Sequence, residues 1–354
     1  MKLKTKILIL LFVIIALAYK FQPSLLDTWQ SNIITGSTII EDKVSTIITE
    51  TTQNSKDPLQ IYFCPRQNCA DKALETLKKA NSSIHCALFD LNIPEIITFL
   101  DQADQYVDVK LVVDDHNFED VKHLSFAKKD SSSQLSHNKF CIIDQEWIFT
   151  GSFNPTMNGY LKNNNNFIVL NSKSLAKNYE AEFQELWNGQ FGKGPTTINT
   201  QVKFNDILIE NYFCPEDWCA NQVLNQIENA NQSVYFMTFS FTHDLIGDLL
   251  LTKHAEGLDI KGVFEKRQQS KYSEFEKLNS TINKGLSSDK LKIKFDKNSA
   301  TMHHKVFIID NKTVITGSFN PTQNGDTNND ENMLIIHDTE VAQMFLDEFE
   351  LVFK

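Results

Sequence analysis

Two stretches of twenty residues share one pattern of polar side chains. "HNKFCIIDQEWIFTGSFNPT" begins at His137, and "HHKVFIIDNKTVITGSFNPT" begins at His303. Each copy has a His and a Lys two residues apart, and residues at this spacing face the same way on a β-strand. Asn154 and Asn320 precede Pro, where the chain leaves the sheet. In each half we therefore expect a His, a Lys and an Asn to converge at one strand end.

Two such sets in one cleft would suit the hydrolysis of a phosphodiester. A phosphoryl transition state spreads negative charge over its oxygens. Amine and amide donors could hold these oxygens, and the candidates are Lys139, Lys305, Asn154 and Asn320. One imidazole could attack phosphorus to form a phosphohistidine, while the other protonates the leaving oxygen and later activates water. No metal-ligand spacing accompanies the motif, so we expect neither a metal nor another cofactor.

The repeat extends beyond these stretches. Residues 61–91 align with residues 211–241, and both segments read as strand, tight turn, amphipathic helix and buried strand. Strand-like segments follow at 107–115 and 258–266. Between this segment and the His motif the second half has about 15 more residues than the first, within 267–302. This stretch contains a helix-like segment, "SEFEKLNSTIN", and a strand-like one, "LKIKF", for which the first half shows no clear counterpart. A helical pattern closes each half, at 174–188 and at 339–353.

Strands that alternate with helices twice over predict an α/β fold with two similar domains packed side by side. We assign repeat 1 to residues 58–194 and repeat 2 to residues 195–354, with the boundary in a Gly-rich stretch that ends in Pro. A pseudo-twofold axis between them would bring the two histidines into one cleft at the seam. Because both half-sites lie in one chain, we expect a monomer.

The N-terminal residues form a separate region. Residues 1–22 contain a basic start and a 13-residue apolar run, which would span about 20 Å as a helix. This pattern predicts either a cleaved signal peptide or an uncleaved membrane anchor. In both cases the rest of the chain would lie outside the cytoplasm, secreted or anchored to the membrane. Residues 23–57 are rich in Ser and Thr and are interpreted as a spacer.

Four of the six cysteines form two closely spaced pairs, Cys64 with Cys69 and Cys214 with Cys219. In an exported protein this spacing favours a disulfide within each pair. A four-cysteine zinc site across the repeats is the alternative. The other two cysteines lie in apolar, strand-like runs and are expected in the core.

The repeated residues resemble the signature of the phospholipase D superfamily, His-x-Lys-x4-Asp followed by Gly-Ser-x-Asn. Both copies match it, at His137, Lys139, Asp144, Gly151, Ser152 and Asn154, and at His303, Lys305, Asp310, Gly317, Ser318 and Asn320. The resemblance covers both repeats. It implies two domains with the active site at their seam, a phosphohistidine intermediate and no metal cofactor, and it implies a structural role for the Asp.

The two copies differ at one position that matters for this resemblance. Members of the family often carry an acid after the motif that orients a catalytic histidine. Glu331 holds this position in the second half, 28 residues after His303, whereas the first half has Asn165. A carboxylate raises the pKa of its His and selects the tautomer better than an amide does. The resemblance favours His137 as the nucleophile and His303 as the acid, but the sequence leaves open which His Glu331 reaches.

Charge and size bear on the substrate. The net charge of −11 means that any polyanion site must be local. Residues 259–297 contain ten Lys and Arg against six Asp and Glu, with Tyr272 and Phe275 among them, so this stretch could bind a nucleic-acid strand. The compact repeats also resemble the nuclease branch of the family. The candidate substrate contacts are Ser152, Ser318, Lys266 and Arg267.

We therefore expect a metal-independent phosphodiesterase, in the first place an endonuclease on DNA or RNA. A phospholipase D or a cardiolipin synthase-like enzyme is the alternative, and the N-terminal segment could then hold the protein at a membrane. A third interpretation is an inactive module that binds nucleic acid or lipid.

Overall fold

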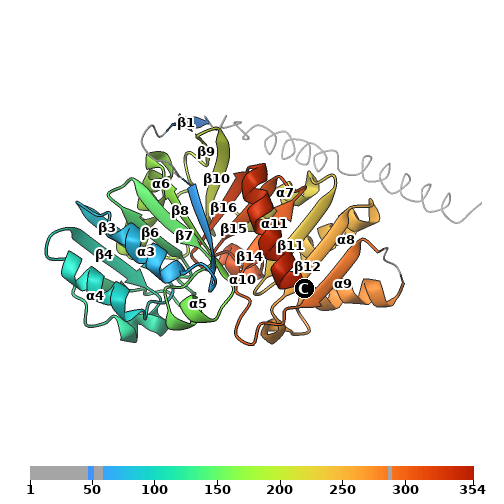
Figure 1. Cartoon of the computed structure of the whole chain (residues 1–354), viewed down its shortest axis with the longest axis horizontal. Helices are drawn as coiled ribbons and strands as arrows, with labels where there is room; N and C mark the ends of the chain where they lie inside the picture. The colour runs from blue at the N-terminus through green and yellow to red at the C-terminus, as the bar shows by residue number, and fades with distance from the viewer. Residues whose placement is uncertain (1–46, 52–58, 286–288) are drawn as a thin grey trace, which may run out of the picture. The chain divides into compact units, whose positions relative to one another are not determined.

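The computed structural model describes residues 47–51, 59–285 and 289–354, which belong to one compact unit (Figure 1). The expected signal peptide or anchor lies outside these residues, and so does most of the expected spacer. Within the described ranges, no helix combines the length and apolar character that a membrane crossing requires.

The first repeat is built on a seven-stranded mixed sheet, in the order β2-β8-β7-β6-β3-β4-β5. The strands are β2 Leu59–Cys64, β3 Ser83–Leu88, β4 Asp108–Val113, β5 Ala127–Lys129, β6 Lys139–Ile143, β7 Trp147–Gly151 and β8 Asn165–Asn171. The helices are α3 Cys69–Leu77, α4 Pro94–Ala103, the 3-10 helix η1 Asp115–Asp120, α5 Met157–Leu161 and α6 Lys173–Trp187.

The second repeat repeats this plan on a nine-stranded sheet, in the order β1-β9-β10-β16-β15-β14-β11-β12-β13. Its strands are β9 Gln201–Phe204, β10 Ile207–Cys214, β11 Ser233–Thr238, β12 Asp259–Phe264, β13 Leu291–Phe295, β14 Lys305–Ile309, β15 Thr313–Gly317 and β16 Glu331–His337. Its helices are α7 Cys219–Glu228, α8 Asp244–Ala255, the 3-10 helix η2 Lys266–Gln268, α9 Glu274–Asn283, α10 Gln323–Thr327 and α11 Thr339–Phe353. The expected α/β fold with two repeated domains is thus confirmed.

Two strands differ from the sequence expectation. β1, Ile48–Glu50, comes from the expected spacer, yet it pairs in parallel with β9. β5, only three residues long, pairs with β4 in the first repeat as β13 pairs with β12 in the second. The strand "LKIKF" therefore has a counterpart, which is too short to show a period of two in the sequence.

The two repeats share a central core. α6 and α11 each bury one stripe of side chains at helical spacing, and a side-chain oxygen of Ser172 or Asp338 caps each N-terminus. One hydrophobic cluster contains residues of both helices and of both sheets, such as Phe183 and Phe345. α3 and α4 cover the outer face of the first sheet, and α7, α8 and α9 that of the second. The seam is thus a packed interior.

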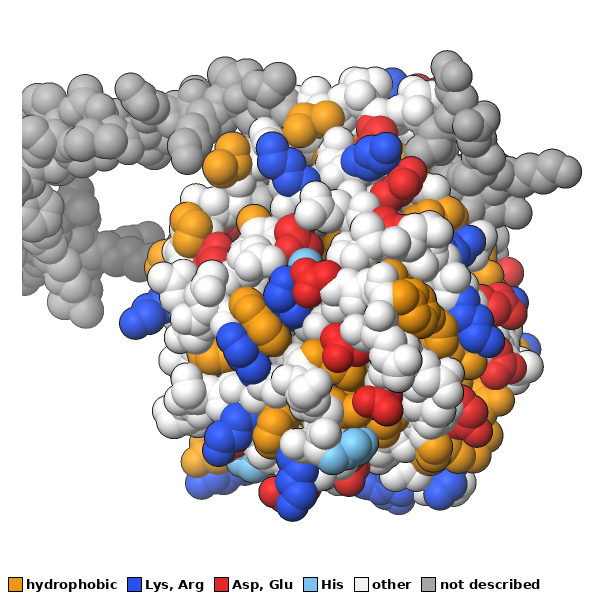
Figure 2. Space-filling view, turned by 90° about the vertical axis from the view of Figure 1, so that its left-hand side faces the viewer, with side chains coloured by type: hydrophobic (Ala, Val, Ile, Leu, Met, Phe, Trp, Pro, Cys, Tyr) orange, Lys and Arg blue, Asp and Glu red, His pale blue; other side chains and the backbone are white. Residues whose placement is uncertain are grey.

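The outer face of the first repeat carries charges of both signs, interspersed with apolar side chains (Figure 2). A surface of this kind creates no extended field of one sign. This face therefore offers no extended basic field to an anionic substrate.

The structure contains three disulfides. Two of them join Cys64 to Cys69 and Cys214 to Cys219, as the spacing favoured, so these sulfurs are not free for the alternative zinc site. The third joins Cys86 to Cys141, which we had placed in the core as single residues. They are buried, but they also face each other in register on β3 and β6. Strand pairing, which the sequence does not show, makes them partners.

Candidate active site

The loops that carry the two histidines are held by the opposite repeat. The backbone N–H of His137 donates to the carbonyl oxygen of Asp330 at 2.9 Å, and that of His303 donates to the carbonyl oxygen of Asn164 at 2.8 Å. Each His comes just before a strand, β6 or β14, whose first residue is the motif Lys. The seam therefore positions both histidines by equivalent contacts.

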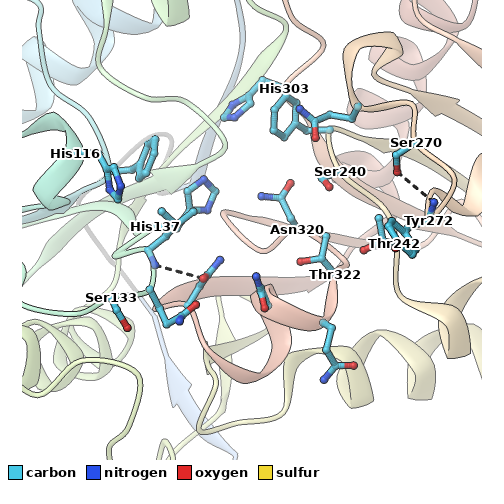
Figure 3. Close-up of a pocket in the computed structure, with 18 residues that line it drawn as sticks. His116, Ser133, His137, Ser240, Thr242, Ser270, Tyr272, His303, Asn320 and Thr322 are labelled. Atoms are coloured by element: carbon cyan, nitrogen blue, oxygen red, sulfur yellow. Dashed lines mark hydrogen bonds between the residues drawn. The ribbon is translucent and has the colours of Figure 1, made fainter.

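Both histidines line one groove of about 930 Å³ at the seam (Figure 3). The other residues that line it are Phe89, His116, Ser133, Gln134, Leu135, Phe239, Ser240, Thr242, Gln268, Ser270, Tyr272, Asn320, Thr322, Gln323, Asn324 and Asn329. None of these lining residues, all from the described ranges, is a Lys or an Arg. The groove wall is polar and largely uncharged.

Each imidazole is oriented across the seam. Nδ1 of His137 lies 2.7 Å from Oε2 of Glu331, so the carboxylate reaches the histidine of the other repeat. Nδ1 of His303 lies 3.0 Å from Oδ1 of Asn165 and 3.0 Å from the carbonyl oxygen of Ser152. When Nδ1–H donates to these oxygens, Nε2 is the ring nitrogen left for a substrate.

Burial shifts the pKa values of the two histidines and of Glu331. It lowers the pKa of both histidines and raises the pKa of Glu331 to about 8, although the nearby Lys139 ammonium counteracts the rise for Glu331. A neutral His137 beside an ionised Glu331 is the form in which Nε2 carries a free lone pair. The pair therefore becomes nucleophilic as Glu331 loses its proton.

The two motif lysines are buried beside the histidines. Nζ of Lys139 donates to the carbonyl oxygen of His137 at 2.6 Å, and Nζ of Lys305 donates to that of His303 at 2.9 Å. Each ammonium also lies about 5 Å from an aromatic ring centroid, that of Phe89 or Phe239. Burial lowers the pKa of both lysines, to about 7 for Lys139. A bound phosphate would favour their charged forms.

The other motif residues divide into two groups. Oδ1 of Asn154 and Oδ1 of Asn320 are buried without a hydrogen-bond partner in the described structure, and Asn320 lines the groove. Buried polar atoms are normally paired, so each Oδ1 is available to a ligand donor, and Nδ2 is the atom that could donate to a phosphate oxygen. The hydroxyls of Ser152 and Ser318, the expected substrate contacts, accept from the backbone N–H groups of Asn166 and Asn332 in their own repeats.

The basic residues assigned to substrate binding do not line the groove. The guanidinium of Arg267 donates to the carbonyl oxygens of Ser299 and Ala300 and to Oγ1 of Thr301. Other cations of this stretch are also bonded elsewhere: Lys261 to Asp259, Lys277 to acids of α8 and α9, and Lys297 to the backbone of Lys354. These cations are therefore held by partners within the second repeat and away from the groove.

The motif acids brace the strands. The carboxylate of Asp144 accepts from the backbone N–H groups of residues 81–83, and that of Asp310 accepts from those of residues 231–233. The backbone donors and the Ser82 hydroxyl outweigh partial burial and lower the pKa of Asp144 to about 2. Both acids hold the turn before β3 or β11.

A polar network beneath the groove was missed in the sequence. Asn166 and Asn332 follow the two orienting residues, and each accepts from a Thr hydroxyl of the opposite repeat, Thr316 at 3.0 Å or Thr150 at 2.6 Å. Nδ2 of Asn332 also donates to Asn138 at 2.9 Å. The signal was present, since Asn occupies this position in both copies, but only the pairing of the repeats gives it a role.

The two ends of the seam differ in their charged side chains. At one end Arg66 pairs with buried Glu348, which also lies 3.1 Å from Nε2 of His304. His304, which follows the motif His303, is therefore a buried structural residue. At the other end the equivalent positions hold Glu216, Glu182 and Asn138. Burial and then the carboxylates of Asp330 and Glu216 raise the pKa of Glu182. Oε2 of Glu216 is buried without a hydrogen-bond partner in the described structure.

We expect Glu216→Arg to stabilise the protein by about 1–2 kcal/mol at pH 7.5, because it gives this end the cation that Arg66 provides at the other. Burial, with neighbouring carboxylates, raises the pKa of Glu185 to about 7 and that of Asp330 to about 8. The folded protein thus holds protons that the unfolded chain releases, so stability falls as the pH rises from about 4 to 8. The variant should flatten this fall, measured as the melting temperature across that range. Glu216→Gln is the control for charge removal alone, and a lower melting temperature of Glu216→Arg at pH 7.5 would contradict the expectation.

Comparison with known proteins agrees with this architecture. The family model described as "Cardiolipin synthase, PLD-like domain" matches residues 73–187 and 223–352, which is more than half of the chain. Phospholipase D of Rickettsia conorii is 34% identical over 137 residues, 39% of this chain and 65% of that protein. Mitochondrial cardiolipin hydrolase of Mus musculus is 29% identical over 134 residues, 38% of this chain and 58% of that protein.

These alignments span less than two thirds of either relative's own length. Among solved structures, phosphatidylserine synthase of Haemophilus influenzae superimposes with a TM-score of 0.63 at 12% identity, over 84% of this chain and 87% of that one. At this identity the likeness concerns the fold. With the duplicated motif and the matched residues, it follows that the chain belongs to the phospholipase D superfamily.

Proposed function

We propose that this protein is a phosphodiesterase that works through a covalent phosphohistidine. One observation supports this most directly: two imidazoles line one groove, and a residue of the opposite repeat bonds Nδ1 of each. A non-catalytic module has no need for two histidines held in matching tautomers. The resemblance to the family implied the same intermediate.

In the first step, Nε2 of His137 attacks phosphorus and the bond from phosphorus to the leaving oxygen breaks. The bound phosphate anion favours the charged form of His303. Its Nε2–H then gives the proton to that oxygen. Lys139, Lys305 and the motif amides are placed to hold the other phosphate oxygens. Glu331 stabilises the positive charge that develops on the His137 ring.

In the second step, water attacks the phosphorus of phosphohistidine. His303, now neutral, takes a proton from the water, and the P–N bond breaks. The products are a phosphate monoester, the released alcohol and the enzyme in its starting state. We assign the attack to His137 because it has the carboxylate partner, whereas the amide of Asn165 leaves His303 easier to deprotonate.

For the substrate we propose a phospholipid, cleaved at the phosphodiester of its headgroup. A nucleic-acid strand carries a charge at every nucleotide and is usually held by a row of Lys and Arg. None of the described residues that line the groove is a Lys or an Arg, and the two buried motif lysines beside the histidines would suffice for one phosphate. Phospholipase D and cardiolipin hydrolase are also the names of the relatives compared above.

An endonuclease is the second candidate, and one feature favours it. The ring of Tyr272 lines the groove and is 69% exposed, and Nζ of Lys271 lies 4.8 Å from its centroid. An exposed aromatic face beside a cation can stack on a base.

The deciding experiment gives both substrates to the full-length chain in EDTA. Vesicles of phosphatidylglycerol or cardiolipin are assayed for phosphatidic acid, and labelled single-stranded DNA is assayed for cleavage. We expect lipid turnover that is absent from the His137→Ala/His303→Ala variant. Cleavage of DNA alone would favour the endonuclease. No turnover of either substrate would favour the inactive binding module. Asp144→Asn controls for losses through stability, because this residue only braces the strand.

A further inference from the structure

Three metal-ligating side chains meet at the edge of the groove, outside the repeated motif. Asp114, Asp115 and His116 follow β4, and one ligand atom from each lies within 4.8 Å of the others. Nδ1 of His116 is 2.9 Å from Oδ1 of Asp114 and 2.7 Å from Oδ1 of Asp115. His116 lines the groove together with His137 (Figure 3).

A fourth residue adds negative charge behind this cluster. Asp130 is 1% exposed, and both of its carboxylate oxygens are buried without a hydrogen-bond partner in the described structure. Burial and then the carboxylates of Asp114 and Asp115 raise its pKa to about 6. The backbone N–H groups of Ser132 and Ser136 counteract this rise, but neither is in hydrogen-bond geometry with it. Buried carboxylates are normally paired or coordinate a metal.

The equivalent positions of the second repeat differ in charge and in hydrogen bonding. The equivalents of Asp115 and His116 are Lys266 and Arg267, which follow β12 as the former follow β4. The equivalent of Asp130 is Asp296, whose oxygens accept from the backbone N–H groups of Lys266 and Asn298. The second repeat therefore has Lys266 and Arg267 where the first has Asp115 and His116. The carboxylate of Asp296 is hydrogen-bonded, whereas that of Asp130 is not.

We propose that Asp114, Asp115 and His116 bind a divalent transition-metal cation, with Asp130 as a buried counter-charge. Two carboxylates and one imidazole form a donor set that suits Mn²⁺ and Zn²⁺. The metal takes the place of the imidazole proton that Nδ1 now shares with the two carboxylates. It also places a positive charge beside a groove whose wall has no Lys or Arg among the described residues.

The proposal is independent of the chemistry at His137 and His303, because binding is measured without a substrate. The full-length chain, first stripped with EDTA and then freed of EDTA, is titrated with MnCl₂ while the free ion is followed by electron paramagnetic resonance. We expect one Mn²⁺ per chain. ZnCl₂ at saturation should raise the melting temperature by about 5 °C.

The second repeat supplies the matched variant. Asp115→Lys/His116→Arg gives the first repeat the residues of the second and replaces two exposed side chains. It should fold, bind no Mn²⁺ and melt no lower than the metal-free wild type. Asp130→Asn should retain the site but weaken Mn²⁺ binding about tenfold, as loss of an outer partner does.

Two results would overturn the proposal. One is a wild-type chain that binds neither Mn²⁺ nor Zn²⁺ at millimolar concentration. The other is an Asp115→Lys/His116→Arg variant that binds them as tightly as the wild type, because the ions would then be held elsewhere.

Discussion

Replacement of His137 by Ala is expected to lower kcat by about 10⁴-fold or more and to abolish the covalent intermediate, because removal of a nucleophile eliminates both steps of the reaction. The variant should still bind substrate, since the lysines and Asn320 remain. The measurement is kcat on the best substrate, together with acid quench of a labelled phosphodiester to detect protein-bound phosphate.

The His303→Ala variant should separate the role of the nucleophile from that of the general acid and base. It is also expected to be inactive on natural substrates, whose alkoxide leaving groups need a proton. With a p-nitrophenyl phosphodiester the leaving group needs no acid, so His137 should still be phosphorylated, and the intermediate should persist because no base activates water. A burst of nitrophenol with labelled protein would show this. If His137→Ala rather than His303→Ala accumulated phosphoprotein, our assignment would be reversed.

Glu331→Gln is expected to lower kcat by about 10²–10⁴-fold with little change in KM. The carboxylate lies 2.7 Å from Nδ1 of His137, where it selects the tautomer and stabilises positive charge on the ring. An amide can rotate to donate to Nδ1, which then favours the tautomer with the proton on Nε2. Asn165→Ala should cost less, because the carbonyl oxygen of Ser152 also holds Nδ1 of His303.

The pH profile distinguishes this role from a structural one. Because burial raises the pKa of Glu331 to about 8, wild-type activity should rise as the pH approaches that value and the carboxylate ionises. Glu331→Gln should lack this ascending limb. A variant with unchanged pH dependence but a lower melting temperature would show that Glu331 only supports the seam.

The sequence predicted the parts of the site that depend on local order. A His and a Lys two residues apart, followed by an Asn before Pro, are local patterns. In the structure each Lys begins a strand and its His lies in the loop just before it. The α/β fold followed from the same repetition. These features need only the periodicity of a strand and the arrangement of elements within one repeat.

What the sequence could not predict depends on contacts between distant segments. Glu331 reaches His137 and not His303 because the repeats face each other, and no spacing within one repeat reveals that. The same holds for Cys86 with Cys141, which are neighbours only through strand pairing. The cations around Lys266 suggested a nucleic-acid site because the sequence does not show their partners, which include acids of α8 and α9 and backbone carbonyl oxygens.

The exchange of orienting residues across the seam also bears on how such an enzyme could arise. Two identical single-repeat chains that paired about a twofold axis would build the same groove, but any substitution would change both histidines at once. With the repeats joined in one chain, one position could become Asn165 while its partner stayed Glu331. Fusion thus lets a symmetric pair of equivalent bases evolve into one dedicated nucleophile and one dedicated acid.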